Sequence, residues 1–187
     1  MRRASIASSV LPALVFAGGC ATTSMPAPEQ APERILAVDG AGQLIRQSTA
    51  DEHSTATYAA PMERVWRALV SSYAEAGIDP TISDPGAGRH GSASFVVPRR
   101  LLDKPIWQYF DCGVGLNGRL VENGRITALI ITTLLPQPDG TTSASTQVTA
   151  SLRRTDSATG TLLNCASTGA IEEFLRGAIS KRLSASR

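Results

Sequence analysis

The sequence has few of the residues on which metal, cofactor and nucleic-acid sites usually depend. Its 187 residues include two histidines and three cysteines, and aromatic residues make up 5% of the chain. Protein metal sites need several ligands at defined spacing, and no such spacing is present, so we expect neither a metal nor another cofactor. Lysine and arginine form no extended block, which leaves no electrostatic reason for nucleic acid to bind.

The apolar stretch at residues 6–17 is broken by two serines and a proline. It is too short to cross a bilayer, which takes a helix of roughly 20 apolar residues. Two arginines precede the stretch and two glycines follow it. A charged start, an apolar centre and small residues at the end are typical of a secretory signal peptide, which is removed from the mature protein.

Cys20 directly follows the two glycines. This arrangement resembles a bacterial lipoprotein signal, which is cut between Gly19 and Cys20 before the cysteine is acylated with chains such as palmitate. The resemblance implies that residues 1–19 are the signal peptide and that Cys20 is the lipidation site. Ala21 stands where aspartate is associated with inner-membrane retention, so the resemblance favours the periplasmic face of the outer membrane. The alternatives are an inner-membrane lipoprotein and, if the signal is an ordinary secretory one, a soluble periplasmic protein.

Residues 20–33 contain three prolines among small and polar residues. Such a segment is extended and semi-rigid, so we interpret it as a lipidated tether.

Loss of Arg2 and Arg3 with the signal leaves 16 Lys and Arg residues against 16 Asp and Glu residues, a net charge of zero. The partners that we expect are therefore the membrane, through the acyl chains, and an envelope protein or a hydrophobic ligand.

Residues 34–187 have the length of one domain. A helix is predicted to begin at Pro61, which suits a first helical turn, and to end at Gly77. A second helix is predicted near Thr168, with Glu172 and Glu173 in the first turn, where the helix dipole favours acids. The apolar positions of the first helix recur at spacings of three and four: Met62, Val65, Trp66, Leu69, Val70, Tyr73 and Ala76.

The segments around these helices are predicted to be strands. Residues 142–153 alternate between apolar and polar, so one face packs and the other meets water or another layer. Residues 125–135 are apolar on both faces, as in a central, covered strand. The order of elements predicts an α+β domain, with two amphipathic helices packed on one face of an antiparallel sheet. Further strands are predicted at 34–38, 43–47, 54–58, 92–97 and 161–165.

Residues 57–69 (TYAAPMERVWRAL) also resemble the opening of helix-grip domains, in which a strand, an Ala-Pro step and a Val-Trp helix precede an antiparallel sheet. The segment resembles members of two branches of that fold. One contains the START and polyketide-cyclase-like ligand binders, and the other contains lipoproteins of the outer-membrane barrel-assembly machinery. The resemblance implies a helix-grip-like fold and does not identify an activity.

Cys112 and Cys165 remain once Cys20 carries lipid. An even pair of cysteines in an oxidising compartment predicts a disulfide. It would close a loop of about 50 residues and contribute about 4 kcal/mol in the chain-entropy model. Two buried free thiols are the alternative. A nucleophilic cysteine is less favoured, because no histidine lies near either cysteine in sequence.

No catalytic residue is predicted. Residues 86–91 match G-x-G-x-x-G, but a dinucleotide site requires this motif to open a helix. Here it leads into a strand pattern, so we expect a hairpin loop. His53 and His90 lie in polar, loop-like segments. His90, Asp84 and a serine could form a triad, but any serine-rich chain contains such a combination of residues, so it is weak evidence for catalysis. We therefore expect a protein that is not an enzyme.

Trp107, Tyr109 and Phe110 bring three of the few aromatic residues into one short segment. They are interpreted either as core or as a partner or ligand surface, where aromatic residues are enriched.

The sequence favours a membrane-anchored, periplasm-facing lipoprotein that acts as a non-enzymatic interaction or envelope-maintenance module. The alternative is a helix-grip binder or carrier of a hydrophobic ligand such as lipid, which requires an apolar cavity beneath residues 174–183.

Overall fold

The computed structural model describes residues 33–38, 43–48, 53–115, 118–155 and 162–185. The predicted signal peptide, its cleavage after Gly19, the lipidation of Cys20 and the tether up to residue 32 lie outside the described residues.

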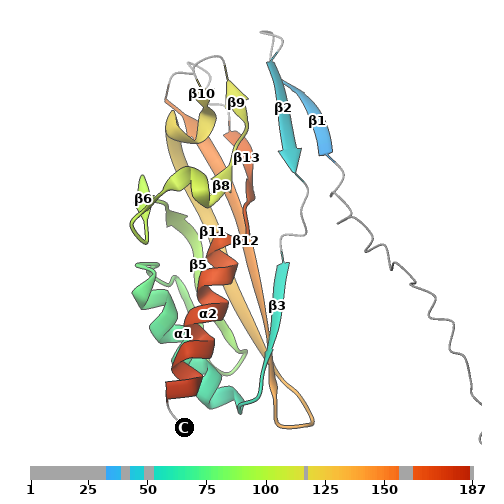
Figure 1. The fold of residues 1–187 in the computed structure, drawn as a ribbon, viewed down its shortest axis with the longest axis vertical. Coiled ribbons are helices and arrows are strands. Elements are labelled where there is room, and N and C mark those ends of the chain that lie inside the picture. The colour runs from blue at the N-terminus through green and yellow to red at the C-terminus, as the bar shows by residue number, and fades with distance from the viewer. Residues whose placement is uncertain (1–32, 39–42, 49–52, 116–117, 156–161, 186–187) are drawn as a thin grey trace, which may run out of the picture.

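An antiparallel sheet forms one layer of the domain and confirms the predicted α+β class (Figure 1). Its strands follow in the order β4, β5, β11, β12, β13 and β8, and β3 pairs with the first half of β12. The long strands β11 and β12 pair along their full lengths at the centre of the sheet. The strands are β3 (His53–Tyr58), β4 (Ile82–Asp84), β5 (Arg89–Val96), β8 (Phe110–Asp111), β11 (Gly124–Pro136), β12 (Thr142–Arg154) and β13 (Leu162–Ser167).

Two helices, α1 (Met62–Glu75) and α2 (Ala170–Ala185), cover one face of this sheet (Figure 1). α1 follows Pro61 and ends before Gly77, whose φ of +67° is the left-handed conformation that favours glycine. The Ile78 amide then donates a hydrogen bond to the Tyr73 carbonyl oxygen at 3.0 Å. The Ile78 side chain is buried, so the predicted glycine end of the helix is confirmed.

Buried side chains fill the space between the helices and the sheet. Helical periodicity predicted most of the α1 contribution, but Val70 is 36% exposed and Ser72 is buried instead. The Ser72 hydroxyl donates to the Ala68 carbonyl oxygen at 2.8 Å, which explains how a polar side chain is accommodated there. The largest fully buried apolar side chains belong to one cluster: Leu69, Tyr73, Ile78, Phe110, Ile126, Ile130, Leu134, Leu152, Ile171, Leu175 and Ile179.

A chain of three hydroxyl groups crosses this apolar core. Tyr73 Oη on α1 lies 3.0 Å from Thr132 Oγ1 on β11, which in turn lies 2.9 Å from Thr146 Oγ1 on β12. A buried hydroxyl left without a partner costs about 1–3 kcal/mol. Because each of these groups has a neighbour in the chain, the contacts position α1 over the two central strands.

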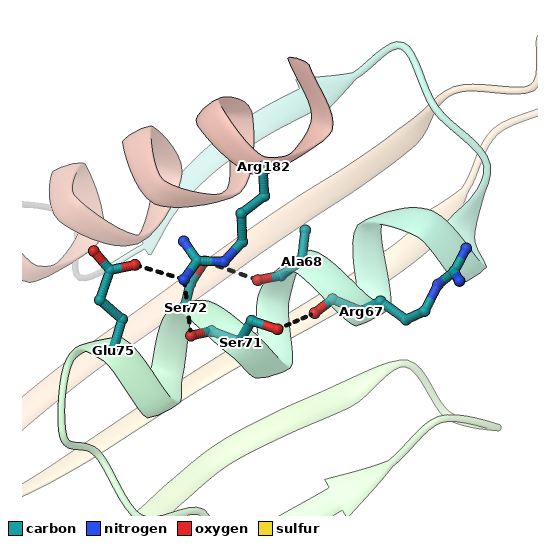
Figure 2. Close-up of polar contacts among 6 residues, drawn as sticks. All are labelled: Arg67, Ala68, Ser71, Ser72, Glu75 and Arg182. Atoms are coloured by element: carbon teal, nitrogen blue, oxygen red, sulfur yellow. Dashed lines mark hydrogen bonds and ion pairs between the residues drawn. The ribbon is translucent and has the colours of Figure 1, made fainter. Parts of the chain in front are cut away.

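Polar contacts join the two helices on their outer side (Figure 2). Arg182 Nη2 on α2 forms an ion pair with Glu75 Oε2 at 2.6 Å and donates to the Ser71 carbonyl oxygen at 3.3 Å. Arg64 Nη2 on α1 donates to the Leu183 carbonyl oxygen, also at 3.3 Å. These contacts hold the C-terminal part of α2 against α1.

Short elements connect β5 to β11, and the sequence analysis predicted none of them. Elements of two or three residues carry no periodicity by which they could be found. They comprise β6 (Arg100–Leu101), β7 (Lys104–Pro105), η1 (Ile106–Gln108), β8, β9 (Val114–Gly115), β10 (Gly118–Arg119) and η2 (Leu120–Glu122). Before β3, the predicted hairpin is present as β1 (Glu33–Val38) paired with β2 (Gln43–Ser48).

Candidate functional site

A disulfide joins Cys112, which follows β8, to Cys165 on β13. The two sulfur atoms lie 2.00 Å apart, and both side chains are buried. The bond links positions 53 residues apart in sequence. It ties the segment of short elements to the strand that leads into α2, so these cysteines are a structural crosslink in the core.

The aromatic segment contributes mainly to the core. Tyr109 and Phe110 are 2% and 0% exposed, and the Tyr109 hydroxyl donates to the Leu101 carbonyl oxygen at 2.8 Å. For these two residues the surface interpretation is corrected, because their rings belong to the main buried cluster. Trp107 alone of the three reaches the surface, and the Arg119 guanidinium lies over its ring, 4.3 Å from the centroid.

His90 lies on β5 and is buried, which corrects its assignment to a polar loop. Its ring packs edge-on against Trp66 and Tyr73, with centroid distances of 5.6 and 5.0 Å. Nδ1 lies 3.2 Å from Ser83 Oγ, and Nε2 has no hydrogen-bond partner among the described residues. Burial lowers the pKa of His90 below its ordinary value, so the neutral ring is favoured at this site.

The structure does not bring His90 and Asp84 together as the acid and base of a triad. The Asp84 carboxylate accepts a hydrogen bond from the Ala87 amide at 3.0 Å, within the turn between β4 and β5. The glycine motif at 86–91 forms that turn and the start of β5, in the expected hairpin. The side chain of His53 lies outside the described residues.

One surface hollow of about 440 Å³ lies between the outer sides of α1 and α2. Three arginines line it, but Arg64 is used in its contact with the Leu183 carbonyl oxygen, and Arg182 in its contacts with α1 (Figure 2). Arg67, the third, is exposed. Two of the three arginines of this hollow therefore serve to hold α1 and α2 together, which explains their presence without a bound ligand.

The opposite face of the sheet, which we call the open face, carries neither of the two described helices (Figure 1). Two hollows of about 450 and 380 Å³ lie on it and share Thr127 and Ser151 as lining residues. Both residues belong to the outward-facing set of the central strands, because their immediate neighbours along β11 and β12 are buried. The two hollows are thus parts of one continuous surface.

Strand register arranges the outward side chains of the open face in rows. Arg125 on β11, Arg153 on β12 and Leu162 on β13 form the first row. The next row crosses the same strands and reaches β5. It consists of Val96, Thr127, Ser151 and Asn164.

Two irregularities in strand pairing flank the larger hollow. On one side, β5 has one extra residue where it passes Leu129 of β11, which is a β-bulge around Ala93. The Thr81 hydroxyl accepts a hydrogen bond from the Ala93 amide at 2.9 Å. On the other side, β3 pairs with residues 142–147 of β12 and β13 pairs with residues 150–153. Thr149 lies where the pairing passes from one strand to the other. Bulges such as the one at Ala93 often adjoin functional sites.

Arg125 and Arg153 stand directly opposite each other at one end of the open face. They line the smaller hollow together with Val96 and Leu162, which are 46% and 57% exposed. In the described part of the chain neither arginine has a carboxylate within ion-pair distance. Like charges directly opposite on paired strands are destabilising, so stability does not explain this arrangement.

The sequence analysis missed this pair, although one signal could have found it. It predicted strands at 125–135 and 142–153 but did not align one with the other. The hairpin turn after β11 sets Pro136 opposite Thr142. Counting back equally from both sides of that turn sets Arg125 opposite Arg153, since paired antiparallel strands keep their register.

No protein-family model matches this chain, and no curated protein is significantly similar to it. Within the described residues, no helix is long and apolar enough to cross a membrane. The same residues contain no group of three or more His, Cys, Asp or Glu side chains placed to hold a metal ion.

Proposed function

We propose that this protein is a lipid-anchored, periplasm-facing interaction or envelope-maintenance module without enzymatic activity. In this proposal, Cys20 anchors the chain in the outer membrane and the open face of the sheet contacts a partner. The anchor is supported by the signal-like N-terminus that ends at Cys20 and by the proline-containing stretch that follows it.

The observation that carries the proposal is the distribution of filled and hollow space around the sheet. Beneath α2, the side chains of Ile171, Leu175 and Ile179 are at most 2% exposed and belong to the main buried cluster. The region that a helix-grip carrier would need for a hydrophobic ligand is occupied by the protein's own side chains. This favours an interaction module over the alternative binder or carrier of lipid, and it leaves the hollowed open face as the contact surface.

Site-specific photo-crosslinking in the intact envelope tests this proposal. Ala93 is exposed and lines the larger hollow of the open face, and Ala74 is exposed on α1. A photoreactive residue is placed at one or the other position of the full lipidated chain, and adducts are identified by mass spectrometry. We expect a discrete protein adduct from Ala93 and none from the matched position Ala74. Absence of a protein adduct at Ala93, together with a co-purifying lipid, would contradict the proposal and favour the carrier.

The anchor is tested separately with Cys20→Ala. Wild-type cells labelled with palmitate should yield labelled protein in the outer-membrane fraction. The variant should carry no label and should not be held there by acyl chains, because several such chains make membrane attachment effectively permanent. Retention of label by the Cys20→Ala chain would show that lipidation occurs elsewhere or that the cysteine is not the anchor.

A further inference from the structure

We infer that the paired guanidinium groups of Arg125 and Arg153 bind carboxylate side chains from an acidic segment of the partner protein. This inference rests on the proposed function, because it specifies which chemistry the open face recognises. The two arginines come from adjacent central strands, and residues directly opposite on paired strands have Cβ atoms about 4.5–5.5 Å apart. The two side chains can therefore reach the same bound group.

The chemistry of the pair matches a carboxylate. A guanidinium presents its N–H donors in a rigid planar fork, and a carboxylate accepts two of them side by side. Elsewhere in the described residues, arginines near carboxylates form ion pairs, as Arg182 does with Glu75 and Arg176 with Glu173. Arg125 and Arg153 line an open hollow with no such partner in the described part of the chain, so an anion from another molecule would complete the site.

The surroundings of the pair suit a peptide. Val96 and Leu162 lie on β5 and β13 at the rim of the hollow and are among the most exposed large apolar residues described. They offer contact area to apolar side chains that flank an acidic residue. The hydroxyl groups of Thr127 and Ser151 in the next row can exchange hydrogen bonds with a peptide backbone. Arginine next to exposed apolar area is typical of protein interfaces.

Two other anionic partners fit this surface less well. A nucleic acid backbone is held by many cations along its length, whereas this hollow has two arginines. A phospholipid headgroup would match the charge, but its acyl chains need continuous apolar surface. Beyond the arginines, the face continues through the hydroxyl-bearing residues Thr127, Ser151 and Thr149. We therefore assign the site to an acidic protein segment.

The experiment uses the full lipidated chain with the photoreactive residue at Ala93, in three forms. These are otherwise wild type, Arg125→Gln/Arg153→Gln, and the matched control Arg67→Gln/Arg176→Gln, which removes two exposed helical arginines. Circular dichroism and formation of the Cys112–Cys165 disulfide verify folding. We expect the adduct yield to fall at least tenfold in the first variant and to stay within twofold of wild type in the control. We also expect the crosslinked partner peptide to contain aspartate or glutamate.

The outcomes separate this inference from the function on which it rests. An undiminished adduct in Arg125→Gln/Arg153→Gln would overturn the role of the arginines and leave the interaction function standing. An adduct with a phospholipid, or with a partner segment that lacks acidic side chains, would also overturn the inference. Absence of any adduct from the wild-type form would overturn both.

Discussion

Arg125 on β11 faces Arg153 on β12 in the register of the two central strands, with both side chains on the open face. Opposed like charges cost stability in isolation, and opposite charges at such positions contribute about 0.2–1 kcal/mol. Arg153→Glu should therefore raise the free energy of unfolding, measured by urea denaturation, by up to about 1 kcal/mol. The same change should abolish the adduct at Ala93.

A gain in stability with a loss of binding would identify the pair as a functional feature that the fold does not need. Arg67→Glu, on the exposed side of α1, is the matched charge reversal and should leave the adduct intact. Our explanation of the pair fails if Arg153→Glu destabilises the protein while the adduct persists.

Tyr73 and Thr132 share a buried hydrogen bond, and Thr132 shares a second one with Thr146. Tyr73→Phe and Thr132→Val should each lower the free energy of unfolding by about 1–2 kcal/mol, because each removes a buried hydrogen bond or leaves a hydroxyl unpaired. The double variant should cost less than the sum of the two single variants. Strictly additive losses in urea denaturation would mean that the hydroxyl chain does not act as a unit.

His90 gives the fold a defined response to acid. Its pKa is lowered by burial from the ordinary value of 6.5, so below that value the unfolded chain binds the proton more readily than the folded one. The free energy of unfolding should fall as the pH drops below about 6.5. Above that pH, the contribution of His90 to it should be constant. In His90→Gln this part of the pH dependence should vanish, as measured by denaturation at pH 7.5 and 5.0. An unchanged difference between the two pH values would exclude His90 as its source.

The disulfide between Cys112 and Cys165 closes a loop across 53 positions of sequence. In the chain-entropy model such a crosslink stabilises the fold by about 4 kcal/mol. Cys112→Ala/Cys165→Ala should lose about this amount, and reduced wild type should unfold at nearly the same urea concentration as the variant. If reduction leaves the midpoint of the wild type unchanged, the crosslink adds no stability.

The repetitive parts of this fold could be predicted from sequence, because burial repeats along them. The spacing of apolar residues in α1 and the alternation in β12 each follow from one buried face, and Gly77 marked the end of α1. By contrast, the hairpin loop expected at residues 86–91 is shorter than predicted, because β5 already begins at Arg89. Gly91 allows β5 to approach β11, since a Cβ atom there would lie 2.1 Å from the Ile130 carbonyl oxygen.

The candidate site depends on relations between strands, and single-strand patterns do not contain them. The bulge at Ala93 appears only when β5 is aligned with β11. Thr149 reads as an ordinary outward residue until β3 and β13 are both placed beside β12. The buried position of Tyr109 likewise follows from packing of a segment that has no periodicity.

Hydroxyl-radical footprinting tests most directly whether the open face is the contact surface. Val96 and Leu162 report on that face and Val70 on the outer side of α1, and all three are exposed in the isolated domain. The oxidation of each side chain is compared between intact envelopes and the purified protein. We expect Val96 and Leu162 to become protected in the envelope, and Val70 to remain as reactive as in the purified protein. Protection of Val70 with unchanged oxidation of Val96 and Leu162 would contradict this expectation.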